Sequence, residues 1–307
     1  MSEPQGAMLA GTKCGVVALI GAPNAGKSTL VNQLVGAKVA IVTHKVQTTR
    51  ARLRGIAMRG ETQLVIVDTP GIFAPRRRLD RAMVEAAWSG ARDADIVVLL
   101  IDAQKGLDDE ARAILERLGD LRQRRILVLN KIDKVPRETL LALTQAVLNE
   151  VEFDATFMLS ALTGDGVEDL LSHLVAASPS GPWLFPEDQI ADAPLRVSAA
   201  EITREKLYLR LHQELPYAST VETLQWKELK DGSVRIEQTV FVERESQKKI
   251  VLGKGGRAIK QISTEAREEL AETLGRPVHL FLFVKVRENW GDDPERYREM
   301  GLDYSDS

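Results

Sequence analysis

The sequence contains little cysteine and no long apolar run. Its single cysteine, Cys14, has no partner for an internal disulfide, which indicates a reducing compartment. No apolar run approaches the roughly 18–20 residues that span a bilayer, and the longest ones, such as residues 96–101, have the length of buried strands. Residues 1–14 lack the charged-then-apolar layout of a signal peptide. We therefore expect a cytoplasmic protein.

A large net charge is also absent. The formal charge of −3 does not by itself indicate a polyanionic partner. Basic side chains nevertheless cluster between Arg244 and Lys260, a segment that contains six basic residues and one acidic residue, Glu245. The 307 residues are 44% hydrophobic and 28% charged, which is typical of a globular chain of about two domains.

The first part of the chain alternates short apolar runs with helical periodicity. We expect strands at residues 15–20, 64–67, 96–101, 126–129 and 156–159, with helices between them, for example over 111–121 and 140–151. This alternation predicts an α/β domain with a doubly wound, mainly parallel sheet. In such sheets ligands bind at the carboxyl ends of the strands.

A second unit follows a linker that contains Pro179, Pro182, Pro186 and Pro194. We expect a helix over 199–215, a hairpin of 220–229 and 233–243 that turns at Asp231–Gly232, a glycine-interrupted helical stretch over 247–274, and a strand over 278–286. The order α-β-β-α-α-β predicts a smaller α+β domain. The expected boundaries are a first domain at 1–178, a linker at 179–195, a second domain at 196–290 and a polar tail at 291–307.

A phosphate loop follows the first expected strand. Its glycines let backbone N–H groups surround a β-phosphate, its lysine places a charge between the β- and γ-phosphates, and its serine hydroxyl is a Mg²⁺ ligand. The start of the next helix adds a favourable dipole. The expected phosphate-binding residues are Gly21, Ala22, Pro23, Asn24, Ala25, Gly26, Lys27, Ser28 and Thr29.

The choice of base is predicted by Asn130-Lys131-Ile132-Asp133, which follows the strand at 126–129. The Asp133 carboxylate accepts two hydrogen bonds, which guanine offers on its N1 and N2 edge and adenine does not. Lys131 can lay its stem along the base, and Asn130 can brace the loop. We expect Ser160, Ala161 and Leu162, after the fifth strand, to offer backbone N–H groups to the guanine O6.

Two further segments complete the nucleotide site. In Asp68-Thr69-Pro70-Gly71, Asp68 is placed to hold a water of the Mg²⁺ shell, and the Gly71 N–H can sense the γ-phosphate. Between this segment and the phosphate loop, one threonine is expected to reach Mg²⁺, Thr49 rather than Thr48. The five segments resemble, in order, those of the GTPase superfamily. The expected metal ligands are Ser28, Thr49 and Asp68, and the expected catalytic residues are Lys27, Thr49 and Gly71.

The position after Gly71 is occupied by Ile72, where many small GTPases have a glutamine that orients the attacking water. We therefore expect slow hydrolysis, with the site completed either by K⁺ near Asn24 or by a group from the switch or a partner. The run Arg76-Arg77-Arg78 suits an arginine finger less well than a solvated switch face.

In the second domain, Gly253-Lys254-Gly255-Gly256 forms a GxxG turn within the basic cluster. Such a turn lets the backbone approach a nucleic acid strand, and the element order is that of a type II KH domain. Val251, Leu252, Ile259 and Ile262 are candidates for the apolar groove that holds bases. The expected RNA-binding residues are Gly253, Lys254, Gly255, Gly256, Arg257, Lys248, Lys249 and Lys260.

The whole chain resembles the Era family, bacterial GTPases with a C-terminal KH domain. Beyond the nucleotide motifs, the resemblance is carried by QTTR (47–50), FPED (185–188), AEITREKL (200–207), ELPY (214–217), VERESQKKIVLGKGG (242–256) and VHLFLFVKV (278–286). Thr203 departs from it, since an apolar residue is common there. The single phosphate loop excludes a tandem GTPase.

The resemblance implies a function. It implies GTP/GDP and Mg²⁺ as ligands, and binding of the 3′ end of small-subunit ribosomal RNA during assembly of the small ribosomal subunit, with the nucleotide state gating the RNA site. It also implies peripheral contact with the inner membrane, which no residue pattern here supports. Nothing indicates an obligate oligomer, so we expect a monomer. Two alternatives stay open: an RNA chaperone in which hydrolysis is incidental, and a signalling GTPase whose second domain binds protein.

Overall fold

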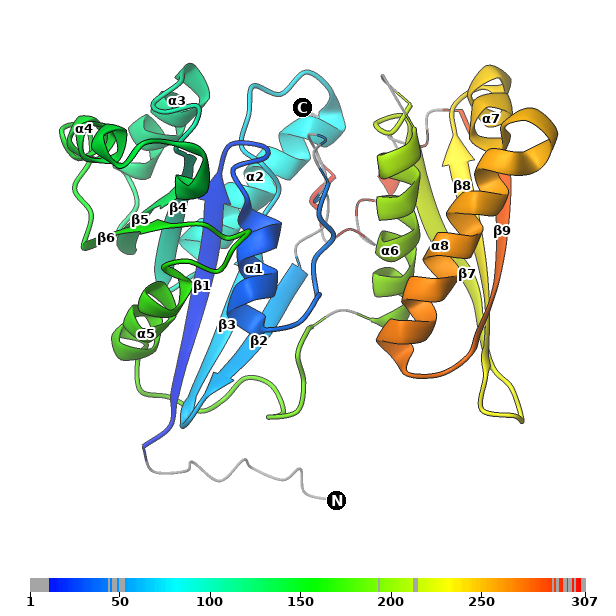
Figure 1. The fold of residues 1–307 in the computed structure, drawn as a ribbon, viewed down its shortest axis with the longest axis horizontal. Coiled ribbons are helices and arrows are strands. Elements are labelled where there is room, and N and C mark those ends of the chain that lie inside the picture. Colours follow the sequence, from blue (N-terminus) through cyan, green and yellow to red (C-terminus); the bar gives the residue numbers. More distant parts are fainter. Residues whose placement is uncertain are drawn as a thin grey trace. The chain divides into compact units, whose positions relative to one another are not determined.

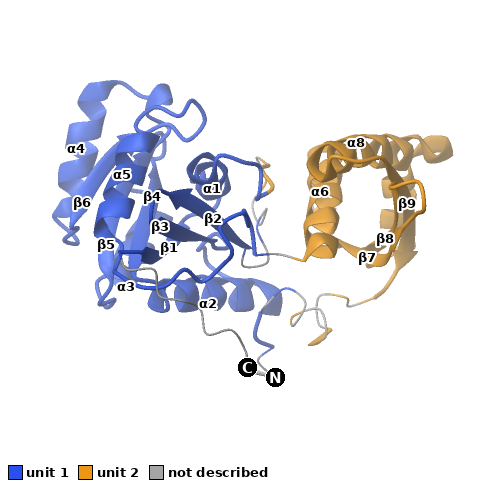
Figure 2. Cartoon of the chain, turned by 90° about the horizontal axis from the view of Figure 1, so that it is seen from below, with its two compact units in different colours: residues 1–40, 49–192, 300–307 blue, residues 41–48, 193–299 orange. Residues whose placement is uncertain are grey.

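The computed structural model describes residues 11–43, 45, 49, 53–192, 194–211, 215–288, 290, 293–294, 297, 300 and 302–304. Within these residues the chain forms two compact units, which are coloured separately in Figure 2. The first comprises residues 1–40, 49–192 and 300–307, and the second residues 41–48 and 193–299.

The first unit contains a six-stranded sheet with the strand order β2-β3-β1-β4-β5-β6 (Figure 1). All neighbouring pairs are parallel except β2 and β3, which are antiparallel. The elements are β1 (Lys13–Gly21), α1 (Lys27–Val35), β2 (Leu53–Arg59), β3 (Thr62–Asp68), α2 (Arg78–Arg92), β4 (Ile96–Asp102), α3 (Asp109–Leu118), β5 (Arg124–Asn130), the 3₁₀ turn η1 (Ile132–Lys134), α4 (Arg137–Leu148), β6 (Ala155–Leu159) and α5 (Val167–Ala177). The predicted α/β fold with a doubly wound sheet is confirmed.

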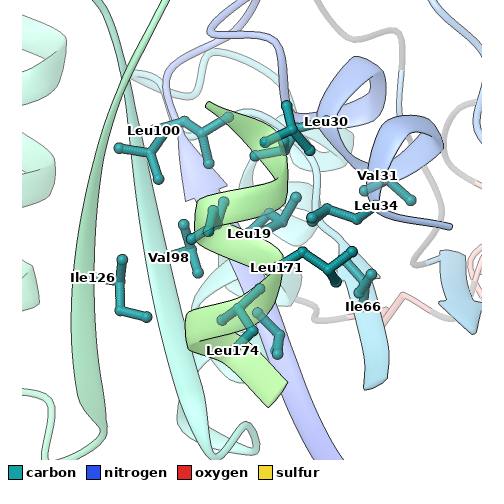
Figure 3. Close-up of a cluster of buried hydrophobic side chains, with 14 of the residues drawn as sticks. Leu19, Leu30, Val31, Leu34, Ile66, Val98, Leu100, Ile126, Leu171 and Leu174 are labelled. Carbon is teal, nitrogen blue, oxygen red and sulfur yellow. The ribbon is translucent and has the colours of Figure 1, made fainter. Parts of the chain in front are cut away.

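Helices cover both faces of this sheet because its central strands are apolar on both sides. In β4 every residue from Ile96 to Asp102 is buried. On one face the strands pack against α1 and α5, whose Leu171 and Leu174 point into the cluster drawn in Figure 3. On the other face the core includes Trp88 of α2 and Ile114 of α3. The strand β2 was missed in the sequence because its outer residues, such as Arg54, are exposed and interrupt the apolar run.

The second unit is a three-stranded sheet, β7-β8-β9, with its helices on one face. The strands β7 and β8 are antiparallel, and β8 and β9 are parallel. Its elements are α6 (Leu195–Arg210), β7 (Ser219–Glu228), β8 (Val234–Val242), α7 (Glu245–Leu252), the 3₁₀ turn η2 (Lys254–Gly256), α8 (Arg257–Leu274) and β9 (Val278–Val286). The predicted order α-β-β-α-α-β is confirmed.

Thr203, the one departure noted from the family pattern, lies on α6 and is completely buried. Its hydroxyl donates to the side-chain carbonyl of Gln238 on β8 at 2.5 Å, and Gln238 donates in turn to the hydroxyl of Thr223 at 3.1 Å. The polar side chain is therefore satisfied inside the second unit, because a buried residue of the adjacent strand accepts its proton.

The contacts divide the chain differently from the sequence-based boundaries. The proline-rich linker is grouped with the first unit up to Asp192. There the N–H of Cys14 donates to the carbonyl of Pro179 at 3.1 Å, and the N–H of Ile56 donates to the carbonyl of Ile190 at 2.9 Å. Conversely, residues 41–48 are grouped with the second unit, although the chain on both sides of them belongs to the first. Residues 291–299 of the expected tail also fall in the second unit.

Candidate guanine-nucleotide and RNA sites

The phosphate loop lies between β1 and α1, at the carboxyl end of the central strand. Gly26 caps α1 with φ at 102°, and a Cβ atom there would lie 2.2 Å from the side-chain nitrogen of Asn130, so only glycine fits. Asn24 has φ at 63°, one of two non-glycine residues with positive φ among those described. The backbone is thus held in an unusual conformation where the amides must turn inward.

Lys27 is buried, and its ammonium spans the loop by donating to the carbonyls of Gly21 and Ala22, both at 3.0 Å. Burial lowers the pKa of Lys27 to about 8, although Asp68 and Glu110 attract the charge and act in the opposite direction. A buried ammonium gains strongly from an anionic ligand, because little water screens the attraction. The position suits a phosphate group.

Three oxygen-bearing side chains predicted as metal ligands meet beside the loop. Ser28 donates to the Asp68 carboxylate at 2.8 Å, the hydroxyls of Ser28 and Thr49 lie 3.0 Å apart, and Thr49 donates to Asp68 at 3.1 Å. The Asp68 Oδ1 atom is buried and has no hydrogen-bond partner within the described part of the chain. Burial raises the pKa of Asp68, against the Ser28 and Thr49 hydrogen bonds and the Lys27 charge.

This donor set fits Mg²⁺, which prefers oxygen ligands and neutralises a buried carboxylate. Thr49 is the predicted threonine of the pair, whereas Thr48 lies outside the described residues. In the rest of the switch segment, Thr69 is buried and donates to the carbonyl of Leu19 at 2.6 Å, and Gly71 is buried against Pro23 of the phosphate loop.

Asn130 connects three parts of the site. Its amide donates to the carbonyl of Ala25 at 2.7 Å, and its side-chain oxygen accepts from the N–H of Ala161 at 2.9 Å. The bracing role predicted for Asn130 therefore has a geometric basis. Lys131 has φ at 67° and pairs with Asp102 at 2.6 Å, while Asp133 is exposed in η1.

The expectation for the Ser160 loop needs a correction. The N–H of Ser160 donates to the carbonyl of Asp165, and that of Ala161 to Asn130, so neither is available for the guanine O6 in this arrangement. The amide of the exposed Leu162 is the one of the three that donates to no protein acceptor among the described residues. The N–H groups of Ser160 and Ala161 are occupied because their hydrogen bonds hold the conformation of this loop.

Sequence reasoning missed Asp102. Asp102 is the last residue of β4 and therefore lies at the same edge of the sheet as the other motifs. Its position at the end of an apolar run is the feature of the sequence that could have identified it. The arginine run makes several contacts. The N–H groups of Arg76 and Arg77 donate to Asp80 in the first turn of α2, and the Arg78 guanidinium contacts the hydroxyl and ring of Tyr304. Ile72 is buried in the apolar core beneath α2.

In the second unit the GxxG turn joins α7 to α8. Gly253 has φ at 72°, and a Cβ atom would lie 2.7 Å from that of Ala258, so a side chain is excluded. The N–H of Gly256 donates to the carbonyl of Gly253 at 3.1 Å and closes the turn. Lys249, Lys254, Arg257 and Lys260 are exposed around it, while Lys248 is partly exposed, 3.8 Å from Glu245. The basic face is thus open to solvent.

Two of the four residues expected to line the apolar groove belong instead to the hydrophobic core of the second unit. Val251 and Ile262 are fully buried between α7, α8 and the sheet, because each points inward on its helix. Leu252 and Ile259 are partly exposed and remain candidates for the groove. Ile250, which the sequence reading passed over, is 60% exposed beside the turn.

Val42 and Lys45 contact α6 within the second unit. The N–H of Val42 donates to the carboxylate of Glu205 at 2.9 Å. The Lys45 ammonium donates to the carbonyls of Tyr208 and Leu211 at the carboxyl end of α6. A cation at this end of a helix is favoured by the helix dipole. These contacts explain why the segment is grouped with the second unit.

Comparison with known proteins matches both domains. A sequence model described as a 50S ribosome-binding GTPase matches residues 16–131, and one described as a KH domain matches residues 214–291. GTPase Era of Rhizobium meliloti is 68% identical over 95% of this chain and 94% of its own length. GTPase Era of Bradyrhizobium sp. (strain ORS 278) is 64% identical over 99% of both chains.

Solved structures extend the match. An Era crystal structure in complex with MgGDPNP and nucleotides 1506–1542 of 16S ribosomal RNA has a TM-score of 0.90 and 38% identity, over 94% of this chain and 99% of that one. A structure of a variant of Aquifex aeolicus Era bound to GDP·AlF₄⁻ matches with the same TM-score, identity and coverage. The chain belongs to the Era family and is a GTPase with a C-terminal KH domain.

Proposed function

We propose that this GTPase is a slow switch that binds the 3′ end of small-subunit ribosomal RNA through its KH unit during assembly of the small ribosomal subunit. The observation that carries the proposal is that one chain combines a guanine-nucleotide site with a GxxG turn whose basic rim is exposed. The Era structure containing 16S ribosomal RNA, 38% identical to this chain, supports the choice of RNA.

Guanine nucleotide and Mg²⁺ are the ligands of the first unit. Asp133 selects guanine, and the buried Lys27 ammonium neutralises the phosphates. Ser28, Thr49 and Asp68 hold Mg²⁺, which when bound stabilises the charge that develops during phosphoryl transfer. The N–H of Gly71 senses the γ-phosphate, and the packing of Gly71 against Pro23 of the phosphate loop supports this role.

Hydrolysis is slow because no side chain of the usual kind orients the attacking water. Ile72 has no hydrogen-bonding group, and its side chain is 7% exposed within the core. Among the groups that can complete the site, K⁺ held near Asn24 is the candidate within the first unit. The exposed position of Asn24 and its positive φ at the rim of the phosphate loop support this assignment.

The nucleotide state acts on the KH unit through residues 41–45. Thr49 belongs to the Mg²⁺ site, and four residues earlier Lys45 contacts the carboxyl end of α6. A change at Thr49 on loss of the γ-phosphate therefore pulls on a segment that is anchored to α6 by Lys45 and by the Glu205 carboxylate. Such switch segments are the usual transmitters of nucleotide state.

The RNA grip is the GxxG turn. The glycines allow a phosphodiester strand to approach the backbone, and Lys254 and Arg257 face its phosphates. A monomer in the cytoplasm is consistent with this function, and contact with the inner membrane, which the family resemblance implies, is a further part of the proposal. In the part of the chain that the structure describes, no helix has both the length and the apolarity to span a membrane.

The test is crosslinking of the GTP-bound protein to ribosomal RNA, followed by mapping of the contacted nucleotides. We expect contacts at the 3′ end of the small-subunit RNA, and their loss in the variant Lys254→Asp/Gly255→Asp. Contacts spread over both subunits, or unchanged in the variant, would contradict the proposal. A GTP-binding but hydrolysis-dead form that still releases RNA and supports assembly would favour the RNA chaperone alternative.

A further inference from the structure

Two aromatic side chains on the edge strand β9 reach the solvent. Phe281 and Phe283 are 42% and 49% exposed. Side chains alternate along β9, so His279 and Lys285, also exposed, share their face. The intervening residues Leu280, Leu282 and Val284 pack against the helices and the core. The four exposed residues therefore form a strip on the outer sheet face, which we call the β9 strip.

An arginine of the neighbouring strand is fixed beside the strip. The Arg235 guanidinium lies 4.4 Å from the ring centroid of Phe281, and Arg235 donates to Glu237 at 2.7 and 3.1 Å. In the parallel register of β8 and β9, Arg235 is level with His279 and Glu237 with Phe281, so all of them belong to the same face. The cation and the ring are thus held as a unit.

We infer that the β9 strip is a base-stacking platform for single-stranded RNA that passes from the GxxG turn over the free edge of β9. It would bind two bases of a single strand, one on each phenylalanine, with Lys285 near the phosphates. Aromatic rings on an open sheet face are a general means of holding unpaired bases, and the stacking tolerates any base. The inference rests on the proposed RNA-binding function of the KH unit.

The strip lies on the strand that α7 packs against, but its side chains leave the opposite face of that strand. Because β9 is the edge strand of its sheet, RNA leaving the turn reaches the strip by crossing this edge. Val251 on α7 lies in the same buried cluster as Val284 and Val286 of β9, so the helix that leads into the turn packs against this strand. The rings stand two residues apart, about 7 Å along the strand. Neighbouring nucleotides of an extended strand can therefore each face one ring.

A protein partner fits the strip less well. A stable protein interface buries about 800 Å² on each side around an apolar centre. Here two rings stand between the polar residues His279 and Lys285, and Thr239 and Phe241 of the adjoining strand are already buried. The mixture of rings and cations in a narrow row suits a nucleic acid strand better.

The test compares RNA oligonucleotides of increasing length, cut from nucleotides 1506–1542 of 16S ribosomal RNA, by fluorescence anisotropy with the full chain. The variant Phe281→Ala/Phe283→Ala should lose at least about tenfold in affinity for oligonucleotides longer than the turn can hold, about four nucleotides. Its affinity for the shortest oligonucleotides should stay within about twofold. Leu209→Ala, which removes an exposed apolar side chain from α6, is the matched control and should not affect either length.

Stacking is separated from simple apolar contact by graded substitutions. Phe283→Trp should keep or increase affinity for the long RNA, whereas Phe283→Leu, which retains an apolar side chain and spares the fold, should lose most of the effect of the ring. The inference would be overturned if the Phe283→Leu variant bound long RNA as tightly as the unchanged protein. It would also be overturned if the Phe281→Ala/Phe283→Ala variant did so.

The same experiment distinguishes the inference from the proposed function beneath it. Lys254→Asp/Gly255→Asp should abolish binding of short and long oligonucleotides alike. If this variant binds normally, the KH assignment fails; if it loses binding while the double alanine variant does not, only the stacking platform fails. Loss of ribosomal-protein binding without loss of RNA affinity would show that the strip is a protein interface and would overturn the inference.

Discussion

The backbone N–H of Val42 donates to the carboxylate of Glu205 at 2.9 Å, across 163 positions of sequence, and the Glu205 residue is only 3% exposed. A buried carboxylate needs such donors, because its desolvation is otherwise uncompensated. The pair therefore fixes one end of a short segment on α6. The other end of this segment continues to Thr49, whose hydroxyl contacts Ser28 and Asp68. This relationship links the two halves of the proposed function.

The first prediction concerns Lys45, which anchors the same segment. Lys45→Met removes the ammonium that contacts the last carbonyls of α6 but retains an apolar stem. We expect GTP affinity to stay within about twofold. The ratio of RNA affinities between the forms bound to a GTP analogue and to GDP should shrink towards one, from a coupling in the usual range of about 5- to 150-fold.

Anisotropy titrations of labelled RNA in both nucleotide states would measure this ratio. Lys230→Met in the β7–β8 turn, which also removes an exposed lysine from the second unit, is the control. An unchanged ratio in Lys45→Met would exclude the segment as the route of coupling.

The second prediction concerns the base. Asp133→Asn should weaken GTP binding and move preference towards xanthosine triphosphate, because an amide can donate a hydrogen bond where xanthine carries an oxygen. Competition with a fluorescent guanine nucleotide gives both affinities. Unchanged GTP affinity would mean that Asp133 does not read the base. The neighbouring exposed Lys134, substituted by alanine, should leave the preference as it is.

The third prediction concerns the monovalent cation. If K⁺ is held near Asn24, single-turnover GTP hydrolysis should be faster in K⁺ than in Na⁺ at equal ionic strength, and Asn24→Ala should remove the difference. Nucleotide affinity of the variant must be measured in parallel, since Asn24 adopts a left-handed backbone conformation that alanine disfavours. Equal rates in both salts, with Asn24→Ala equally neutral, would rule out this role.

The fourth prediction concerns the buried pair Thr203 and Gln238. Thr203→Val preserves shape but leaves the Gln238 carbonyl without its donor, so we expect a loss of about 1–3 kcal/mol in the free energy of unfolding. Urea denaturation measures it. A double-mutant cycle with Gln238→Leu should show coupling between the two positions. Additive effects would mean that the hydrogen bond is not what stabilises Thr203.

The fifth prediction concerns Cys14, whose thiol is buried on β1. Burial raises its pKa above the ordinary value of 9.0, although the Leu184 N–H acts in the opposite direction. The native thiol should therefore react slowly with iodoacetamide at pH 8 and rapidly in urea, unlike a Ser246→Cys probe on the exposed start of α7. Rapid native labelling at pH 8 would contradict the burial.

The sign of the linked stability effect follows from the same shift. The pKa of the Cys14 thiol is higher in the folded protein than in the unfolded chain. The stabilising contribution of this thiol to the free energy of unfolding is therefore complete below pH 9. It decreases as the pH rises towards the native pKa. Urea denaturation of Cys14→Ser should show a smaller loss of stability above pH 9.

The sequence alone determined the alternation of strands and helices in the first domain, the phosphate loop, the base-reading motif and the GxxG turn. These features depend on neighbouring residues: a glycine that must adopt positive φ, a lysine before a serine, or a carboxylate after a strand. Local spacing was therefore sufficient to find them. The strand β9 was predicted with the bounds observed, Val278–Val286, because its alternation is regular.

The tertiary structure decided what depends on residues far apart in sequence. Asn130 contacts Ala25 and Ala161 from two other loops. It thereby accepts a hydrogen bond from the backbone N–H of Ala161, which the sequence predicts to donate to the guanine O6. Val251 and Ile262 become core, and Lys45 and Val42 attach to α6, because packing chooses which apolar and charged groups lose water. Sequence gives the chemical groups of each segment, and only the folded chain fixes which of those groups remain free to bind a ligand.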